Sequence, residues 1–213
     1  MKAINKKSLR YMSDQPKYIL IAPPKGQEEL NTYIKWVESN GFSAVILEEG
    51  AQDISGPLLL CGGADLGVNP ARDKRELEWI QMALDADQPI IGVCRGMQVL
   101  NHFFGGKVSS IVDSIVEDHR SDDFTEDVDH SERISQYHWV MDLNNNMQQV
   151  NSRHHQYCET VAKNFTVTHL SFGCGYIPEA FEDLQHKIWA VQWHPERMES
   201  ADNSYPLDRL KVA

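Results

Sequence analysis

The first half of the chain alternates short apolar runs with segments in which apolar residues recur at helical spacing. The apolar runs carry no polar alternation, which is typical of strands in a parallel sheet that is covered on both faces. Helices then connect successive strands. The apolar runs occupy 17–24, 43–47, 57–63 and 89–93, and the helical patterns occupy 28–41, 71–87 and 95–106.

The second half of the chain has a different pattern, in which short runs of β character are separated by loops. These runs occupy 137–143, 165–172, 177–182 and 187–193. We therefore predict an α/β fold of the doubly wound type, with a mainly parallel sheet, helices on both faces and extra strands late in the chain. Since 213 residues suffice for one substantial core, we expect a single domain over 17–213. The polar residues 1–16 are expected to form an extension that precedes it.

Charge and composition exclude several classes of function. The formal net charge is -11, whereas nucleic-acid binding draws most of its affinity from a basic surface. No apolar run approaches the ~20 residues that span a membrane, and residues 1–17 lack the apolar core of a secretory signal. We expect neither nucleic-acid nor membrane partners. The four cysteines form no Cys-x-x-Cys pair, so a reducing cytoplasm is the expected compartment.

Cys94 lies at the junction between an apolar run and a helical pattern, within the stretch GVCRG. A residue on such a sharp strand-to-helix turn takes strained backbone angles and presents its side chain at the top of the sheet. The turn crowds the residues two positions away, so glycine suits positions 92 and 96. The helix N-terminus also favours a thiolate. We predict a nucleophile; the alternative is a small buried cysteine beside ordinary turn glycines.

A second strand end supplies partners for a thiol nucleophile. His194 follows the apolar run that ends at Trp193, and Glu196 lies two residues further on. In extended backbone the two side chains share a face, and Pro195 favours extended backbone at His194. His194 would take the thiol proton, and Glu196 would orient the imidazole. Alone, this stretch could equally be a surface turn, but together with Cys94 it completes a triad.

Acyl transfer also needs hydrogen-bond donors for an oxyanion. The backbone N–H groups of Gly62 and Gly63 follow the neighbouring apolar run, and that of Arg95 follows the predicted nucleophile. We predict that these three residues form the oxyanion hole. A plain strand-ending turn is the alternative for the glycine pair.

Four segments together carry a family resemblance. GVCRGMQVLN, CGGADL, VNSRHHQ and AVQWHPE resemble the class I glutamine amidotransferase-like superfamily, and in particular its stand-alone γ-glutamyl hydrolase branch. The resemblance covers residues 17–197 and implies a flavodoxin-like sheet. It also implies a triad of Cys94, His194 and Glu196 that attacks a γ-glutamyl amide and forms a thioester, which water then hydrolyses.

The resemblance further implies which residues contact the substrate. Gln98, one helical turn after the nucleophile, matches the position that contacts the glutamyl group, and Ser152 and His154 match an Asn-Ser-x-His segment of the hydrolase branch. Without the resemblance, the adjacent histidines would indicate a solvated loop. Cys61 departs from the family, which often has proline or a small residue there. The acidic loop over 112–136 is expected to shape the entrance of the site.

Four functional hypotheses follow from these residues. The first is a hydrolase of a small γ-glutamyl amide, with no cofactor and no metal. The second is a glutaminase subunit that delivers ammonia to a separate synthase partner. The third is a zinc site, which is less favoured because metal ligands usually have close helical or hairpin spacing; its ligands would be Cys94, His154, His155, His194 and Glu196. The fourth, a binding module with an inactive triad, is the least favoured.

Overall fold

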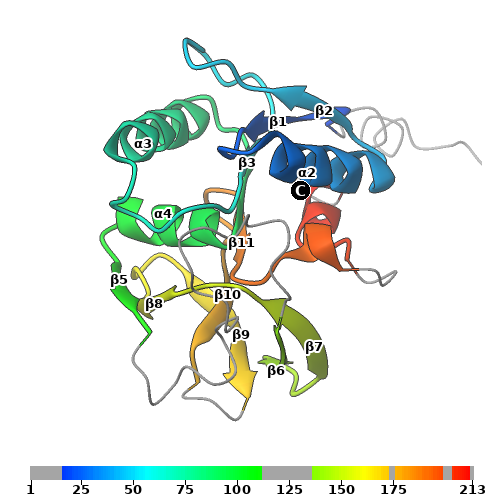
Figure 1. The fold of residues 1–213 in the computed structure, drawn as a ribbon, viewed down its shortest axis with the longest axis vertical. Helices are drawn as coiled ribbons and strands as arrows, with labels where there is room; N and C mark the ends of the chain where they lie inside the picture. The colour runs from blue at the N-terminus through cyan, green and yellow to red at the C-terminus, as the bar shows by residue number, and fades with distance from the viewer. Residues whose placement is uncertain (1–15, 112–135, 173–175, 199–202, 212–213) are drawn as a thin grey trace, which may run out of the picture.

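A computed structural model describes residues 16–111, 136–172, 176–198 and 203–211. Except for Pro16, the predicted N-terminal extension lies outside the described residues, and so do Cys174 and the acidic loop except for Gln136. Within the described residues, nine strands form one sheet in the order β2-β1-β3-β4-β11-β10-β9-β6-β7 (Figure 1). The strands are β1 (Tyr18–Ala22), β2 (Ser43–Ile46), β3 (Leu58–Leu60), β4 (Ile90–Val93), β6 (Gln136–Asp142), β7 (Met147–Ser152), β9 (Thr166–Phe172), β10 (Pro178–Asp183) and β11 (Ile188–Val191).

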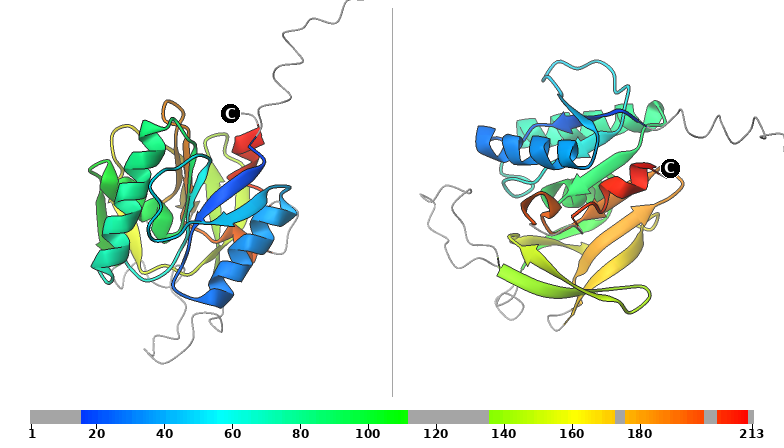
Figure 2. Two further views of the ribbon diagram at one scale, coloured as in Figure 1. Left: turned by 90° about the horizontal axis from the view of Figure 1, so that it is seen from above. Right: turned by 90° about the vertical axis from the view of Figure 1, so that its right-hand side faces the viewer.

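The sheet has a parallel part and an antiparallel part. From β2 to β11 every neighbouring pair is parallel, whereas the pairs from β11 through β10, β9 and β6 to β7 are antiparallel. The antiparallel strands extend the sheet beyond the part that the helices cover (Figure 2). This arrangement confirms the predicted α/β class, the parallel first half and the extra late strands.

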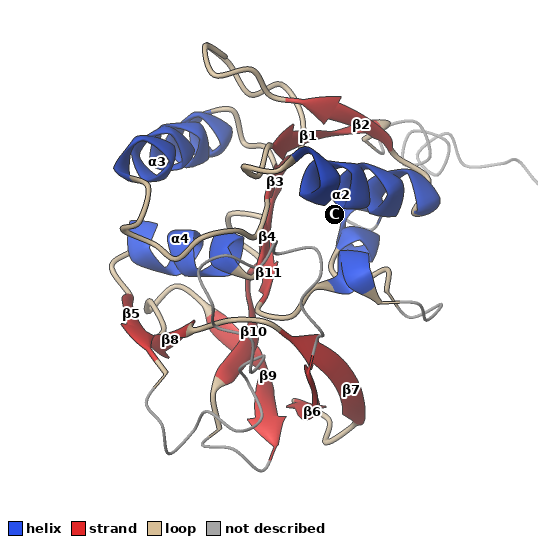
Figure 3. Ribbon diagram, viewed as in Figure 1, coloured by secondary structure: helices blue, strands red, loops and turns tan. Residues whose placement is uncertain are grey.

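Helices lie on both faces of the parallel part (Figure 3). One face packs against α2 (Gln27–Ser39), and the other against α3 (Pro70–Asp85) and α4 (Arg95–Phe103). Side chains that alternate along a strand supply the two cores. In β1, Ile19 and Ile21 join the core under α2, while Leu20 and Ala22 join the core under α3 and α4. The apolar runs are therefore uninterrupted because both faces of these strands are covered, as predicted.

Four strands depart from the sequence-based expectation. The side chains of Val45 and Ile46 in β2 are exposed because β2 is an edge strand. β7 was not predicted, since its sequence MQQVNS is mostly polar and its strand conformation comes from pairing with β6. β5 (Lys107–Ser110) and β8 (Gln156–Thr160) were also missed, and they form a separate antiparallel pair beside α4.

The end of the chain packs against the helix α2. The 3-10 helix η3 (Leu207–Lys211) buries Leu207 and Leu210 in the same core as Tyr33 and Trp36. The indole nitrogen of Trp36 also donates a hydrogen bond to the carbonyl of Asn203 at 2.7 Å. Within the described ranges, none of the helices has both the length and the apolar character needed to cross a membrane.

Candidate active site

Cys94 stands on a strained corner between β4 and α4. Its backbone has φ +51° and ψ -107°, a conformation that non-glycine residues rarely adopt. A Cβ on Gly96 would lie 2.2 Å from the carbonyl oxygen of Leu60, and one on Gly92 would lie 2.9 Å from the backbone nitrogen of Met97. Both glycines are therefore required by close backbone packing, as the sequence predicted.

Three strand ends converge at this corner. β4 lies between β3 and β11, and Gly92 is in register with both Leu60 and Ala190. The residues that follow these strands consequently meet at one edge of the sheet. A Cβ on Gly62 would lie 2.9 Å from Cε1 of His194 and 3.6 Å from the Cβ of Cys94. The structure thus brings together Cys94, His194 and the glycine loop.

His194 and Glu196 contact each other directly. Nδ1 of His194 lies 2.6 Å from Oε1 of Glu196, and both side chains are buried. This contact leaves Nε2 of the imidazole for Cys94. The backbone differs from the predicted extended strand, because Pro195–Arg197 forms the 3-10 helix η2. Proline at the first position of a helical turn explains the difference, since its fixed φ suits that position.

The electrostatics of His194 favour the imidazolium. Burial by itself lowers the pKa of His194, but the negative charges of Glu196 and Cys94 and hydrogen bonds to both side chains outweigh it and raise that pKa to about 10. The Cys94 and His194 side chains therefore interact directly. Burial raises the pKa values of the fully buried Cys61 and Cys158 thiols, which makes these groups poor nucleophiles.

Asn151 is a further residue of the candidate site that was not predicted from the sequence. Its side-chain amide donates to the carbonyl of His194 at 2.9 Å, and its side-chain oxygen accepts from the N–H of His194 at 2.8 Å. Asn151 is fully buried at the end of β7. The predicted substrate segment Asn-Ser-x-His offered a signal, because Asn151 is its first residue. The side chain holds the backbone of His194.

The predicted oxyanion donors differ in their surroundings. The N–H of Gly62 donates to the hydroxyl oxygen of Tyr33 at 2.9 Å, so the structure already uses this donor. The N–H of Gly63 meets no acceptor among the described residues. The N–H of Arg95 belongs to the first residue of α4, where helices leave their N–H groups without intrahelical partners. Gly63 and Arg95 therefore remain as candidate donors.

The predicted substrate contacts are buried in the protein framework. The side-chain nitrogen of Gln98 donates to the carbonyl of Gln156 at 2.8 Å and to Oε1 of Gln192 at 3.2 Å. Ser152 is fully buried. Nδ1 of His154 lies 2.9 Å from the same carbonyl of Gln156. His154 is therefore part of a buried network, whereas the histidine pair considered in isolation would indicate a solvated loop.

That network continues to a buried carboxylate on β10. Oε1 of Glu179 lies 3.3 Å from Nε2 of His138 and 3.7 Å from Nε2 of His154. Burial raises the pKa of Glu179, but the hydrogen bonds and charges of the two histidines outweigh it and lower that pKa to about 2. Glu179 is consequently an anion at neutral pH. Its backbone carbonyl accepts from the N–H of Gln192 at 2.7 Å, which ties the cluster to the segment preceding His194.

The zinc hypothesis gains no geometric support. Across the described ranges, no group of three or more His, Cys, Asp and Glu side chains is arranged to hold a metal ion. Nδ1 of His155 lies 3.7 Å from Oδ1 of Asp65, a half-buried residue on the loop that precedes α3. The proposed ligand set is therefore not assembled around one point.

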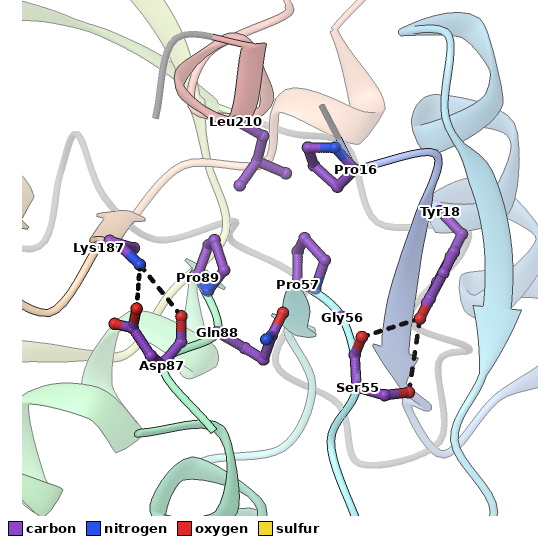
Figure 4. Close-up of a pocket in the computed structure, with 10 residues that line it drawn as sticks. All are labelled: Pro16, Tyr18, Ser55, Gly56, Pro57, Asp87, Gln88, Pro89, Lys187 and Leu210. Atoms are coloured by element: carbon purple, nitrogen blue, oxygen red, sulfur yellow. Dashed lines mark hydrogen bonds and ion pairs between the residues drawn. The ribbon is translucent and has the colours of Figure 1, made fainter. Parts of the chain in front are cut away.

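A pocket of about 310 Å³ lies at the opposite end of the parallel strands (Figure 4). It is lined by residues that precede or begin β1, β3, β4 and β11, and by Leu210 of η3. The amine of Lys187 is paired with Asp87 at 2.6 Å, and the hydroxyl of Tyr18 donates to the carbonyl of Ser55 at 2.9 Å. None of the predicted site residues lines this pocket.

Comparison with known proteins identifies related chains. The model of one protein family, Peptidase C26, matches residues 19–196. The glutamine amidotransferase-like protein YvdE of Lactococcus lactis is 34% identical over 184 residues, which cover 84% of this chain and 74% of that protein. A γ-glutamyl-CDP-amidate hydrolase of Campylobacter jejuni is 24% identical, with coverage of 68% and 64%.

Solved structures share the fold. A protein from Thermoplasma acidophilum, assigned to GMP synthase as one of its subunits, has a TM-score of 0.69 at 17% identity, and the match covers 92% of each chain. A glutamine amidotransferase from Thermotoga maritima has a TM-score of 0.62 at 16% identity, with coverage of 84% of this chain and 76% of that one. The fold and the resemblance predicted from the sequence are thereby confirmed.

Proposed function

Because this chain belongs to the Peptidase C26 family, we propose that it is a cysteine-dependent hydrolase of γ-glutamyl amides. One observation carries the proposal: the strained corner at Cys94 adjoins His194, whose ring lies 2.6 Å from the Glu196 carboxylate. A thiol nucleophile, an imidazole and an orienting carboxylate are the parts that acyl transfer requires. The hydrolase named among the relatives acts on a γ-glutamyl compound, which supports the substrate class.

The first half of the reaction forms a thioester. The Cys94 thiolate attacks the γ-carbonyl carbon, and the carbonyl π electrons move to the oxygen. The N–H groups of Gly63 and Arg95 stabilise that oxyanion. His194 donates the proton on Nε2 to the amide nitrogen, the C–N bond breaks, and the amine leaves. Glu196 keeps Nδ1 protonated and holds the ring in place.

The second half restores the enzyme. Neutral His194 takes a proton from water, and the resulting hydroxide attacks the thioester carbonyl. A second oxyanion forms in the same position. Its collapse breaks the C–S bond, which releases glutamate and returns the thiolate beside the imidazolium. One water is consumed for each amide cleaved, and no cofactor enters the balance.

The proposal is tested by intact-mass spectrometry after treatment with a glutamine-analogue diazoketone. We expect a single adduct on the wild-type protein and none on Cys94→Ala. Hydrolysis of γ-glutamyl amides should vanish in Cys94→Ala and fall by several orders of magnitude in His194→Ala. Circular dichroism should show that both variants remain folded. Substantial hydrolysis by Cys94→Ala would overturn the assignment.

A glutaminase subunit is the second candidate, and the amidotransferase-like names among the relatives favour it. The triad and the thioester would be the same, but the ammonia released from glutamine would pass to a synthase. Steady-state assays distinguish the two functions. A stand-alone hydrolase turns over γ-glutamyl amides by itself, whereas a glutaminase subunit reaches full turnover only after its synthase is added.

A further inference from the structure

We propose that Arg72 and Glu76, on α3, are positioning residues that hold both halves of the oxyanion hole, an inference that rests on the acyl-transfer chemistry proposed above. Neither residue touches the reacting atoms. They act through the backbone of the glycine loop and through Arg95. One ion-pair network therefore sets the two N–H groups that stabilise the oxyanion.

Arg72 binds the backbone of the glycine loop. Nη2 of Arg72 donates to the carbonyl of Gly62 at 2.9 Å and to that of Cys61 at 3.3 Å. A Cβ on Gly63 would lie 2.3 Å from Nη1 of Arg72, so the guanidinium also fills the space beside this residue. Gly63 has φ +139°, which a side chain would disfavour. The loop is thus fitted around one arginine.

Because the peptide bond is planar, these carbonyl contacts also determine which way the N–H groups of the loop point. In a trans peptide unit the carbonyl and the N–H point to opposite sides. The carbonyl of Cys61 faces Arg72, and the N–H of the same unit, that of Gly62, donates to Tyr33 on the other side. The carbonyl of Gly62 likewise faces Arg72, so the N–H of Gly63 points away from it. Arg72 therefore fixes the orientation of the remaining donor in the loop.

Glu76 links Arg72 to Arg95. One oxygen of the Glu76 carboxylate binds Nε of Arg72 at 2.7 Å, and the other binds Nη1 of Arg95. Nη2 of Arg95 binds Asp73, one helical turn earlier on α3. Arg95 follows Cys94 directly and carries the second candidate donor. Glu76 consequently bridges the two backbone segments that supply the hole.

Burial distinguishes this network from ordinary surface ion pairs. The exposed fractions are 5% for Arg72, 1% for Glu76 and 2% for Arg95. Removing such charges from water is costly, and apolar side chains would often stabilise a core at least as well. Rigid, preorganised donors are what oxyanion stabilisation requires. The position of the network, between α3 and both donor segments, matches that requirement.

The test compares two reactions of the same thiol. Acetylation by p-nitrophenyl acetate passes through an oxyanion: the Cys94 thiolate attacks the ester carbonyl, and p-nitrophenolate leaves. Alkylation by iodoacetamide is a direct displacement of iodide at carbon and forms no oxyanion. Neither reagent carries a glutamyl group. Both rates are measured on Arg72→Lys and Glu76→Gln, with Cys94→Ala giving the background of other thiols.

We expect acetylation to slow about 100-fold in both variants, near the lower end of the loss caused by removing one oxyanion donor. Alkylation should keep its wild-type rate. Arg72→Lys retains the positive charge and serves if Glu76→Gln does not fold. The matched control is Glu78→Gln, an exposed residue on α3 paired with Lys74, which should change neither rate.

Two results would overturn the proposal: equal losses in both reactions, which indicate a merely structural role, or no loss of acetylation. The proposed function is judged separately. If the wild-type protein cleaves no γ-glutamyl amide but the variants lose acetylation selectively, the hydrolase proposal fails while the positioning role stands.

Discussion

The side chain of Asn151 binds the backbone of His194 at both of its polar groups, accepting from the N–H at 2.8 Å and donating to the carbonyl at 2.9 Å. The contact joins the end of β7 to the segment that follows β11. These two hydrogen bonds fix the position of the His194 backbone, from which the imidazole side chain extends. The ring is then fixed at its other end by Glu196.

Asn151→Ala should therefore damage catalysis beyond its effect on stability. It leaves two buried backbone groups of His194 without partners, at a cost of about 1–3 kcal/mol for each. We expect kcat to fall while KM changes little, and thermal unfolding measures the accompanying loss of stability. The matched control is Asn164→Ala, which removes a hydrogen bond to Asp183 at the opposite end of the sheet. An equal fall in kcat in both variants would contradict the role of Asn151.

The pKa of His194 predicts an alkaline limb in the pH–rate profile. The imidazolium must donate a proton to the leaving amine, so activity falls as the pH rises through about 10. In Glu196→Gln, a charge that raises this pKa is missing, and the limb should move to lower pH. Profiles of kcat/KM for wild type, Glu196→Gln and the exposed control Glu78→Gln measure the shift. An unmoved limb in Glu196→Gln would count against the assignment.

Gly96→Ala should destabilise the fold itself. The added Cβ would lie 2.2 Å from a backbone oxygen, which cannot rotate away as a side chain can. Overpacking of this kind costs about 1–3 kcal/mol or more. Urea denaturation measures the loss. Gly50→Ala is the control, because a Cβ at that position meets nothing within 4 Å; similar midpoints for the two variants would exclude the steric explanation.

The lowered pKa of Glu179 predicts that the protein loses stability in acid. Its pKa is lowered to about 2, because the hydrogen bonds and charges of His138 and His154 outweigh the burial that raises it. A lowered pKa contributes stability above the unfolded-state value, and that stability is lost as the pH falls through the folded-state value. The free energy of unfolding should therefore fall by up to about 1.4 kcal/mol per pH unit across this range.

Glu179→Gln should lack that contribution, so its stability should depend less on pH in acid. Chemical denaturation at several acidic pH values checks the prediction. The exposed Glu38→Gln variant on α2 should keep the wild-type dependence. If Glu179→Gln keeps it as well, the cluster of Glu179, His138 and His154 is not the source.

Local patterns in the sequence predicted the framework. The alternation of apolar runs and helices from 17 to 106 predicted the parallel sheet and its two helical layers, because each periodicity reports which side chains are buried within one element. The corner at Cys94 was predictable for the same reason. Glycine is needed at positions 92 and 96 because a Cβ would clash with the turn itself or with the adjacent strand. The mostly polar strand β7 escaped prediction, since polar residues carry no comparable periodic signal.

Only the tertiary structure revealed how the site is held together. Asn151 and His194 are 43 residues apart, Tyr33 and Gly62 are 29 apart, and Glu76 and Arg95 are 19 apart. No local periodicity links such residues, because their pairing depends on the order in which strands and helices pack. The sequence by itself determined the type of sheet, the cysteine corner between a strand and a helix, and the family to which the chain belongs. Packing decided which donors stay open and which side chains support them, because each of these contacts joins elements distant in the chain.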